Sequence, residues 1–205
     1  MSYNEIPEQK SIETTQAALL EKKYAVEVVS SAAEALESIK KAILADASVM
    51  NGSSVTLEQI GFVEYLKSNE HSWNNLHATI VAEEDQVQQQ KLRQAALHAE
   101  YYLGSVHALT ETGEMMIASN TGSQLPHLAF TSQNLIIVVG AQKIVPTLDD
   151  AFSRLTEYVV PLEEDHMQQK YGVGTQLNKI LIVKNESTMT NRNVQVILVT
   201  ENLGF

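Results

Sequence analysis

Three short polar segments contain the residues best suited to chemistry, and each follows an apolar run. The first is a turn of small and polar residues, namely Asn51, Gly52, Ser53 and Ser54. Backbone amides and hydroxyls placed before a helix suit an anion such as a carboxylate or a phosphate. Because a strand, a small turn and a capped helix also build most α/β crossovers, a purely structural turn is the alternative interpretation.

The helix that follows this turn has a predicted start at Thr56. The Thr56 hydroxyl can cap the helix, and Gln59, three residues later, can reach back to complete a capping box. Val55 and Ile60 occupy the flanking positions of a hydrophobic staple. Such a cap leaves the amides of the preceding turn available to a ligand.

The second polar segment, Thr110-Glu111-Thr112-Gly113-Glu114, is predicted to be a turn between two short strands. Glu111 could act there as a base, a nucleophile or a hydrogen-bond acceptor. The structural alternative is a carboxylate that makes a salt bridge or stabilises the turn. Thr112 and Gly113 are candidate ligand-binding residues beside it.

The third polar segment covers residues 120–126 and adds the candidate ligand-binding residues Thr121, Gly122 and Ser123. A predicted buried strand then ends at Gly140, and Lys143 follows just beyond it. Lys143 could pair with a bound anion, pair with Glu111 or extend to solvent. Gly140 and Lys143 complete the predicted ligand site.

Other catalytic signatures are missing from the sequence. The Gly172-Val173-Gly174 run lacks the third glycine of a dinucleotide motif, and no glycine-rich loop ends in the Gly-Lys-Ser/Thr of a P-loop. No serine lies in the context of a nucleophile elbow. The six histidines are scattered without the paired spacing of a zinc site, so we expect no metal site and interpret each histidine as a surface or packing residue.

The charge of the chain limits its partners. The net charge is -11, with acidic clusters at 83–85 and 163–165. Such a field repels phosphate backbones and anionic lipids, so we expect neither a nucleic acid nor a membrane partner. A small anionic ligand remains compatible, because distant charges are screened within about 10 Å in salt.

The chain has no cysteine among its 205 residues, so no cofactor can be bound through a thiolate. An iron–sulfur cluster would therefore have to come from another protein, and the cofactor is otherwise left open. The first ten residues form no signal segment, and no apolar run reaches the roughly 18 residues that span a bilayer. We expect a cytoplasmic protein.

Apolar runs rich in β-branched residues predict strands, which are 24–29, 76–81, 105–109, 115–118 and 135–139. The runs 179–183 and 194–200 are interpreted as a closing β-hairpin or a sheet extension. Helical periodicity predicts one long amphipathic helix over 85–102.

Two further helices have predicted capping boxes, at Ser31 with Glu34 and at Thr147 with Asp150. Pro161 should end or kink the second of them. The alternation indicates an α/β fold, organised as a loose arm and the start of a helix over 1–18 and a single domain over 19–205. In such folds, ligands usually bind beyond the carboxyl ends of the strands.

Four segments together resemble the LUD domain family, which is named for lactate utilization. They are Val28-Val29 with Ala33-Glu34-Ala35-Leu36, 52–61, 110–113 and 138–151, within a resemblance that extends from about 19 to 199. It implies a Rossmann-like three-layer α/β sandwich similar to the sugar-phosphate isomerase and CoA-transferase group (NagB/RpiA/CoA transferase-like). The chain resembles the single-domain members, but it has Thr175-Gln176-Leu177-Asn178-Lys179 where many members carry an arginine-containing segment.

The resemblance implies a role in the oxidation of L-lactate to pyruvate, with partner proteins that carry the iron–sulfur clusters. We therefore expect a protein that binds a small anionic ligand and acts with such redox partners. The alternative is a CoA-transferase-like or ligase-like enzyme that uses Glu111. The sequence leaves open whether the protein is a catalyst, and exposed helices make a homodimer a further expectation.

Overall fold

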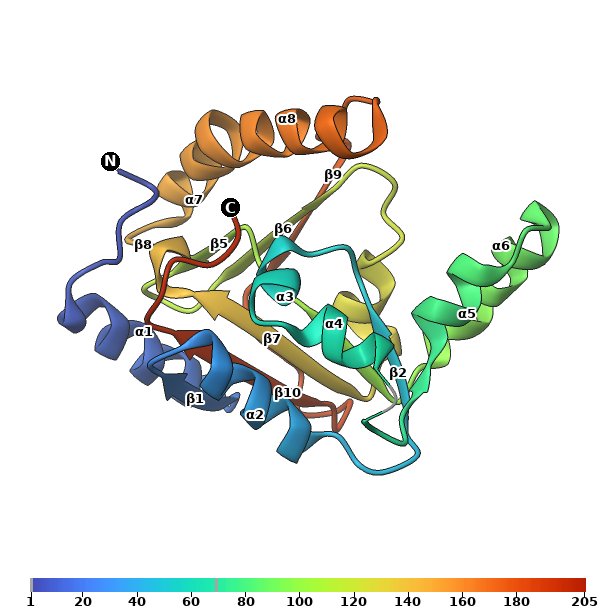
Figure 1. Cartoon of the computed structure of the whole chain (residues 1–205). Helices are drawn as coiled ribbons and strands as arrows, with labels where there is room; N and C mark the ends of the chain where they lie inside the picture. The colour runs from blue at the N-terminus through green and yellow to red at the C-terminus, as the bar shows by residue number, and fades with distance from the viewer. Residues whose placement is uncertain (1, 69) are drawn as a thin grey trace.

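The computed structural model describes residues 2–68 and 70–205, and its centre is a parallel six-stranded sheet (Figure 1). The strand order is β1-β10-β7-β4-β2-β3. The strands are β1 (Ala25–Val29), β2 (Ser48–Asn51), β3 (Asn74–Asn75), β4 (Tyr101–Gly104), β7 (Asn134–Gly140) and β10 (Asn193–Val199). Strands β7 and β10 are rich in Val, Ile and Leu and are buried almost throughout, as expected when both faces of a parallel sheet are covered.

Helices cover both faces of this sheet. On one face, α2 (Ala32–Ala42), α3 (Val55–Gln59) and α4 (Phe62–Lys67) enclose an apolar cluster that includes Ile39, Leu57 and Phe62. On the other face, α1 (Gln9–Glu21) buries Ile12 and Leu19 together with residues of a second sheet. This arrangement confirms the predicted Rossmann-like three-layer sandwich.

The second sheet has the order β8-β5-β6-β9. Its strands are β5 (Ala108–Thr110), β6 (Met115–Ser119), β8 (Ile144–Val145) and β9 (Lys179–Val183). Helix α7 (Leu148–Arg154), the π-helical segment η4 (Leu155–Val159) and helix α8 (Val160–Tyr171) pack on its outer side through an apolar cluster that includes Met116, Ala151 and Leu155. Helix α8 thereby lies over the same end of the molecule as the turn after β2 (Figure 1).

The predicted closing hairpin is wrong, because the two last strands lie in different sheets. Strand β9 pairs with β6, whereas β10 lies between β1 and β7 in the large sheet and is parallel to both. Strand β9 extends the second sheet at its edge, β10 lies inside the large sheet, and the turn-rich segment between them crosses from one sheet to the other.

Two helix and strand predictions between residues 76 and 103 are also wrong. Residues 76–81 form a helix, α5 (Leu76–Ala82), because the Asn75 side chain caps it by accepting from the Ala78 amide (3.0 Å). The predicted long helix ends early, as α6 (Gln86–Ala95) and the 3-10 turn η1 (Ala96–His98), because the next residues form β4 in the middle of the sheet. Helices α5 and α6 project from the body (Figure 1).

The cap of α3 differs from the prediction. Ser54 is the capping residue, and its Oγ accepts from the Leu57 amide (3.3 Å). Thr56 and Gln59 instead hold residues 203 and 204, since Thr56 donates to the Leu203 carbonyl (3.4 Å) and Gln59 accepts from the Gly204 amide (2.6 Å). With only five residues, α3 also has too short a dipole to be an anion site by itself.

The capping box of Thr147 and Asp150 is confirmed. The box at Ser31 is incomplete, since Ser31 accepts from the Glu34 amide but the Glu34 carboxylate accepts from Ser30. Pro161 does not end its helix. It lies in the first turn of α8, directly after the π-helical segment η4, and the chain continues helically from α7 through η4 into α8.

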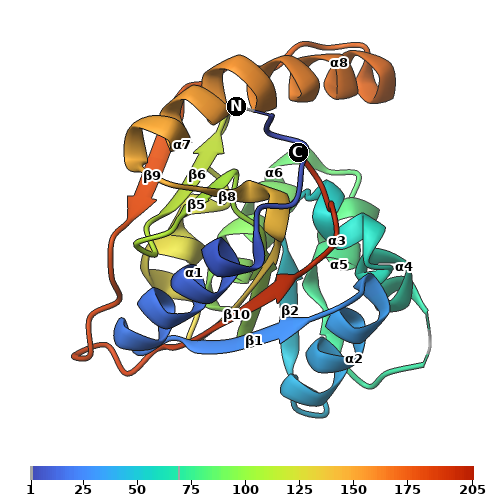
Figure 2. The ribbon, with the colours of Figure 1, turned by 90° about the vertical axis from the view of Figure 1, so that its left-hand side faces the viewer.

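The N-terminal segment is not a loose arm. Arg154 donates to the Tyr3 carbonyl (3.4 Å), Tyr158 donates to the Asn4 side chain (3.0 Å), and Asn202 donates to the Asn4 carbonyl (2.8 Å). Both chain ends therefore lie at the same end of the molecule, close to α7 and α8 (Figure 2). No helix in residues 2–68 and 70–205 has the length and the apolar composition needed to span a membrane.

Candidate functional site

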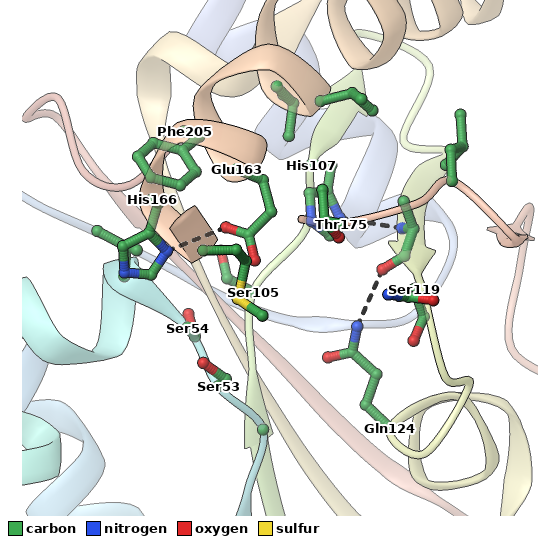
Figure 3. A pocket seen from close by; sticks show the side chains of 18 of the residues that line it. Ser53, Ser54, Ser105, His107, Ser119, Gln124, Glu163, His166, Thr175 and Phe205 are labelled. Carbon is green, nitrogen blue, oxygen red and sulfur yellow. Dashed lines mark hydrogen bonds and ion pairs between the residues drawn. The ribbon is translucent and has the colours of Figure 1, made fainter. Parts of the chain in front are cut away.

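A cavity of about 350 Å³ lies beyond the carboxyl ends of β2 and β4, under helix α8 (Figure 3). Its walls are the turn after β2, the segment 104–107 after β4, the end of β6 with the following loop, and α8 with Phe205. Apolar side chains of η4 and α8 close the outer side. This is the position at which parallel α/β sheets usually bind ligands.

Six of the eleven predicted ligand-binding residues meet at this cavity. The lining includes Gly52, Ser53, Ser54, Thr121, Ser123 and Lys143. Asn51, Gly122 and Gly140 are not part of the lining. A side chain at Gly140 would come within 2.8 Å of the Leu203 amide, and Gly122 has a positive φ of 85° against the Lys179 side chain. The buried Oδ1 of Asn51 has no partner among the described residues.

Glu111 lies outside the cavity, together with Thr112 and Gly113. Its carboxylate accepts a hydrogen bond from the Ser11 hydroxyl (2.6 Å), which ties the β5–β6 turn to α1. Gly113 has a positive φ of 84° beside the Lys22 side chain. The structure therefore does not bring this turn together with the other predicted site residues, and its contacts are those of a turn carboxylate.

Lys143 is the basic group at the base of the cavity. It ends the 3-10 turn η3 (Ala141–Lys143) directly after β7, and only 3% of it is exposed. Its Nζ donates to Thr56 Oγ1 (2.8 Å) and Ser105 Oγ (3.2 Å), and no carboxylate among the described residues pairs with it. Burial, and then the positive charge of Arg154, hold the pKa of Lys143 well below its ordinary value.

Arg154 and His107 lie close to Lys143. Arg154 is fully buried, donates to the His107 carbonyl, and has its pKa lowered to about 10 by burial. His107 Nδ1 accepts from the Ala118 amide (3.0 Å), so the neutral ring carries its proton on Nε2. Burial, followed by the charges of Lys143 and Arg154, lowers the pKa of His107 to about 3, so this ring stays neutral at ordinary pH.

Helix α8 contributes an acid–base pair to the opposite wall. Glu163 Oε2 lies 3.2 Å from His166 Nδ1, and the His166 ring meets the Phe205 ring edge to face with centroids 5.7 Å apart (Figure 3). The interpretation of every histidine as a surface or packing residue missed His107 and His166. The Glu163–His166 spacing of three residues on one helix face was an available signal, whereas no local pattern marks His107.

Residues 203–205 close the cavity beside Lys143. Gln142 donates to the Leu203 carbonyl (2.8 Å), and Thr56 and Gln59 hold the same segment from α3. Gly204 has a positive φ of 71°, and its backbone passes so close that an added Cβ would lie 2.9 Å from Lys143 Nζ. Phe205 consequently reaches the cavity wall.

No three His, Cys, Asp or Glu side chains group into a metal site within the described chain. The family model for the LUD domain matches residues 12–199. The chain belongs to the LUD domain family. A crystal structure of a DUF162 family protein from Deinococcus radiodurans is similar, with a TM-score of 0.58, 15% identity, and coverage of 93% of this chain and 96% of that one. At this identity the likeness shows the fold, and no curated protein matches the chain.

Two of the four LUD-like segments meet at the cavity. The segment 52–61 forms its near wall, and 138–151 supplies Lys143, while 28–36 and 110–113 lie elsewhere. The stretch 175–179 also reaches the cavity, through Thr175, Gln176 and Leu177. In this LUD domain, the base of the cavity thus comes from two of the segments on which the resemblance was based, and part of the rim does not.

Proposed function

We propose that this LUD-domain protein takes part in lactate utilization by binding a small carboxylate, of the lactate and pyruvate class, in the cavity under α8. The observation that carries the proposal is Lys143, a buried base that faces the cavity without a carboxylate partner among the described residues. The family membership supplies the metabolic context.

The charges around Lys143 support an anion there. Hydroxyl oxygens such as those of Thr56 and Ser105 cannot compensate a full ammonium charge in a buried site. Arg154 adds a second buried positive charge nearby. A carboxylate that enters would supply the missing countercharge and would favour the charged form of Lys143.

The size and lining of the cavity fit a small hydroxylated or carbonyl-containing acid. A volume of about 350 Å³ lies at the lower end of the roughly 300–1,000 Å³ of typical ligand pockets. Ser53 and Ser54 can donate hydrogen bonds to ligand oxygens, while Val159 and Met167 provide apolar surface for a short carbon chain.

In this proposal the redox chemistry is shared with partner proteins. Oxidation of lactate to pyruvate removes two electrons, and a chain without cysteine cannot hold an iron–sulfur cluster through its own thiolates. Iron–sulfur proteins would therefore accept the electrons. The alternative, a CoA-transferase-like or ligase-like enzyme using Glu111, has no comparable support, because that carboxylate lies outside the cavity.

Titration calorimetry with L-lactate and pyruvate tests the proposal. We expect both acids to bind the wild-type chain and Lys143→Met to weaken binding at least about tenfold, which corresponds to about 1.4 kcal/mol. Lys41→Met, the same change at an exposed position on α2, is the matched control and should bind as the wild type does. Absence of binding to the wild type, or unchanged binding in Lys143→Met, would overturn it.

A further inference from the structure

We propose that Lys143 is a nucleophile that forms an imine with the carbonyl carbon of a 2-oxo acid bound in the cavity. This inference rests on the proposed function, because it requires a 2-oxo acid such as pyruvate at that site. It goes further by giving the amine a covalent role. It also distinguishes pyruvate from lactate, since lactate has no keto carbonyl group for the amine to attack.

The hydrogen bonds of Lys143 leave room for a nucleophilic lone pair. Thr56 donates its own proton to the Leu203 carbonyl (3.4 Å), and Ser105 donates to the Val106 carbonyl (3.5 Å). Both hydroxyl oxygens therefore act as acceptors for Nζ, at 2.8 Å and 3.2 Å. A neutral amine has two hydrogens and a lone pair, so these two bonds use its hydrogens and leave the lone pair free.

The surroundings favour the neutral amine. Lys143 is 3% exposed and has no carboxylate partner within residues 2–68 and 70–205, while Arg154 is buried nearby. Both burial and Arg154 lower the pKa of the amine, whereas the pKa of Arg154 remains about 10. Arg154 thus keeps the positive charge, and desolvation beside a second cation is a recognised way to activate a lysine.

The cavity also contains a group that can move the protons of the reaction. The carboxylate of Glu163 accepts from His166 Nδ1 (3.2 Å), which leaves Nε2 as the basic nitrogen of the ring. Both residues extend from α8 toward the wall that carries Ser53, Ser54 and Ser105 (Figure 3). His166 can therefore accept a proton from the attacking amine and return it to the departing oxygen.

The step balances without an oxidant or a reductant. The Nζ lone pair forms a bond to C2 of the acid, and the carbonyl π electrons move to the oxygen. That oxygen takes up the two protons released by the amine and leaves as water, while nitrogen and C2 form the C=N bond. One further proton from solvent converts the imine into the iminium ion.

Reductive trapping tests this inference on the whole chain. The protein is incubated with pyruvate and sodium cyanoborohydride, and the products are analysed by intact mass and peptide mapping. We expect a single reduced pyruvyl adduct on Lys143, no adduct with L-lactate, and loss of the adduct in Lys143→Arg. Lys179→Arg removes an exposed lysine near the cavity rim and should leave trapping unchanged.

The outcomes separate this inference from the proposed function. No adduct, or an adduct that maps to a different lysine, would overturn the imine even if calorimetry shows that pyruvate binds. If pyruvate neither binds nor forms an adduct, both proposals are overturned. If Lys143→Arg does not fold, the peptide map of the trapped wild-type chain still decides which lysine has reacted.

Discussion

Lys143 is held by neutral hydroxyls beside a buried arginine, so its protonation state must respond to any charged group that enters the cavity. The same residue can serve two ligand types for this reason. A 2-oxo acid offers a keto carbon to the fraction of the amine that is neutral, whereas a 2-hydroxy acid has no carbon that the amine can attack. His107 does not share this behaviour, because its pKa of about 3 keeps it neutral.

Lactate binding is predicted to take up a proton at Lys143. The pKa of the free amine lies well below 10.5, and a bound carboxylate would raise it. Affinity should therefore be greatest below the pKa of the free amine and should fall as pH rises from that value toward the pKa of the complex. Calorimetry in two buffers of different ionisation enthalpy measures the uptake directly. A proton uptake that persists in Lys143→Met would assign the effect to another group.

The segment 203–205 and α3 act as a unit at the element scale. Thr56, Gln59 and Gln142 bind the backbone of this segment, and Gly204 supplies the positive φ that lets it pass over Lys143. Side chains predicted to cap a helix thus hold the wall of the cavity instead.

Gly204→Ala should destabilise the chain and weaken ligand binding. A residue with a Cβ at a φ of 71° costs roughly 1–2 kcal/mol, and the added Cβ would also overlap Thr56 Oγ1, which adds about 1–3 kcal/mol. Gly172→Ala is the matched control, because Gly172 has a φ of 69° with no atom within 4 Å of an added Cβ. Chemical denaturation should show a larger loss for Gly204→Ala. Equal losses in both variants would show that the segment 203–205 moves away at little cost.

The elements that could be predicted from sequence are those with a strong local signal. The apolar run 135–139 identified β7, and Thr147 with Asp150 identified the start of α7, because burial on both faces and a capping box leave direct patterns. The position of β10 between β1 and β7 could not be predicted, since the pairing joins the two ends of the chain. The cap at Thr56 failed because Ser54 offered an equivalent hydroxyl two residues earlier.

The residues of the candidate site also divide into those with a local sequence signal and those without one. Ser53, Ser54 and Lys143 could be found because each follows a strand, and parallel strands place such residues at one edge. Phe205 could not be found, because it reaches the cavity only through the packing of the segment 203–205. His107 follows β4 but no local pattern marks it, and the only local signal for His166 was its spacing from Glu163. Glu111 was a plausible carboxylate in a polar turn, but its turn belongs to the second sheet and faces α1.

At the scale of the whole molecule, a net charge of -11 surrounds a cavity whose base holds the buried basic groups Lys143 and Arg154. These charges act over different distances. The acidic surface repels an anion at long range, while Lys143 and Arg154 attract it only after it has entered a region from which water and salt are largely excluded.

This separation predicts that salt strengthens the binding of lactate. Raising ionic strength from about 0.01 M to about 0.1 M shortens the screening length from about 30 Å to about 10 Å, which suppresses the surface repulsion and leaves the buried attraction nearly unchanged. Calorimetry should therefore show a modest rise in affinity, with the same trend for salts of a small and a bulky anion, so that competition by chloride can be recognised. A fall in affinity with both salts would mean that exposed cations, rather than Lys143 and Arg154, bind the acid.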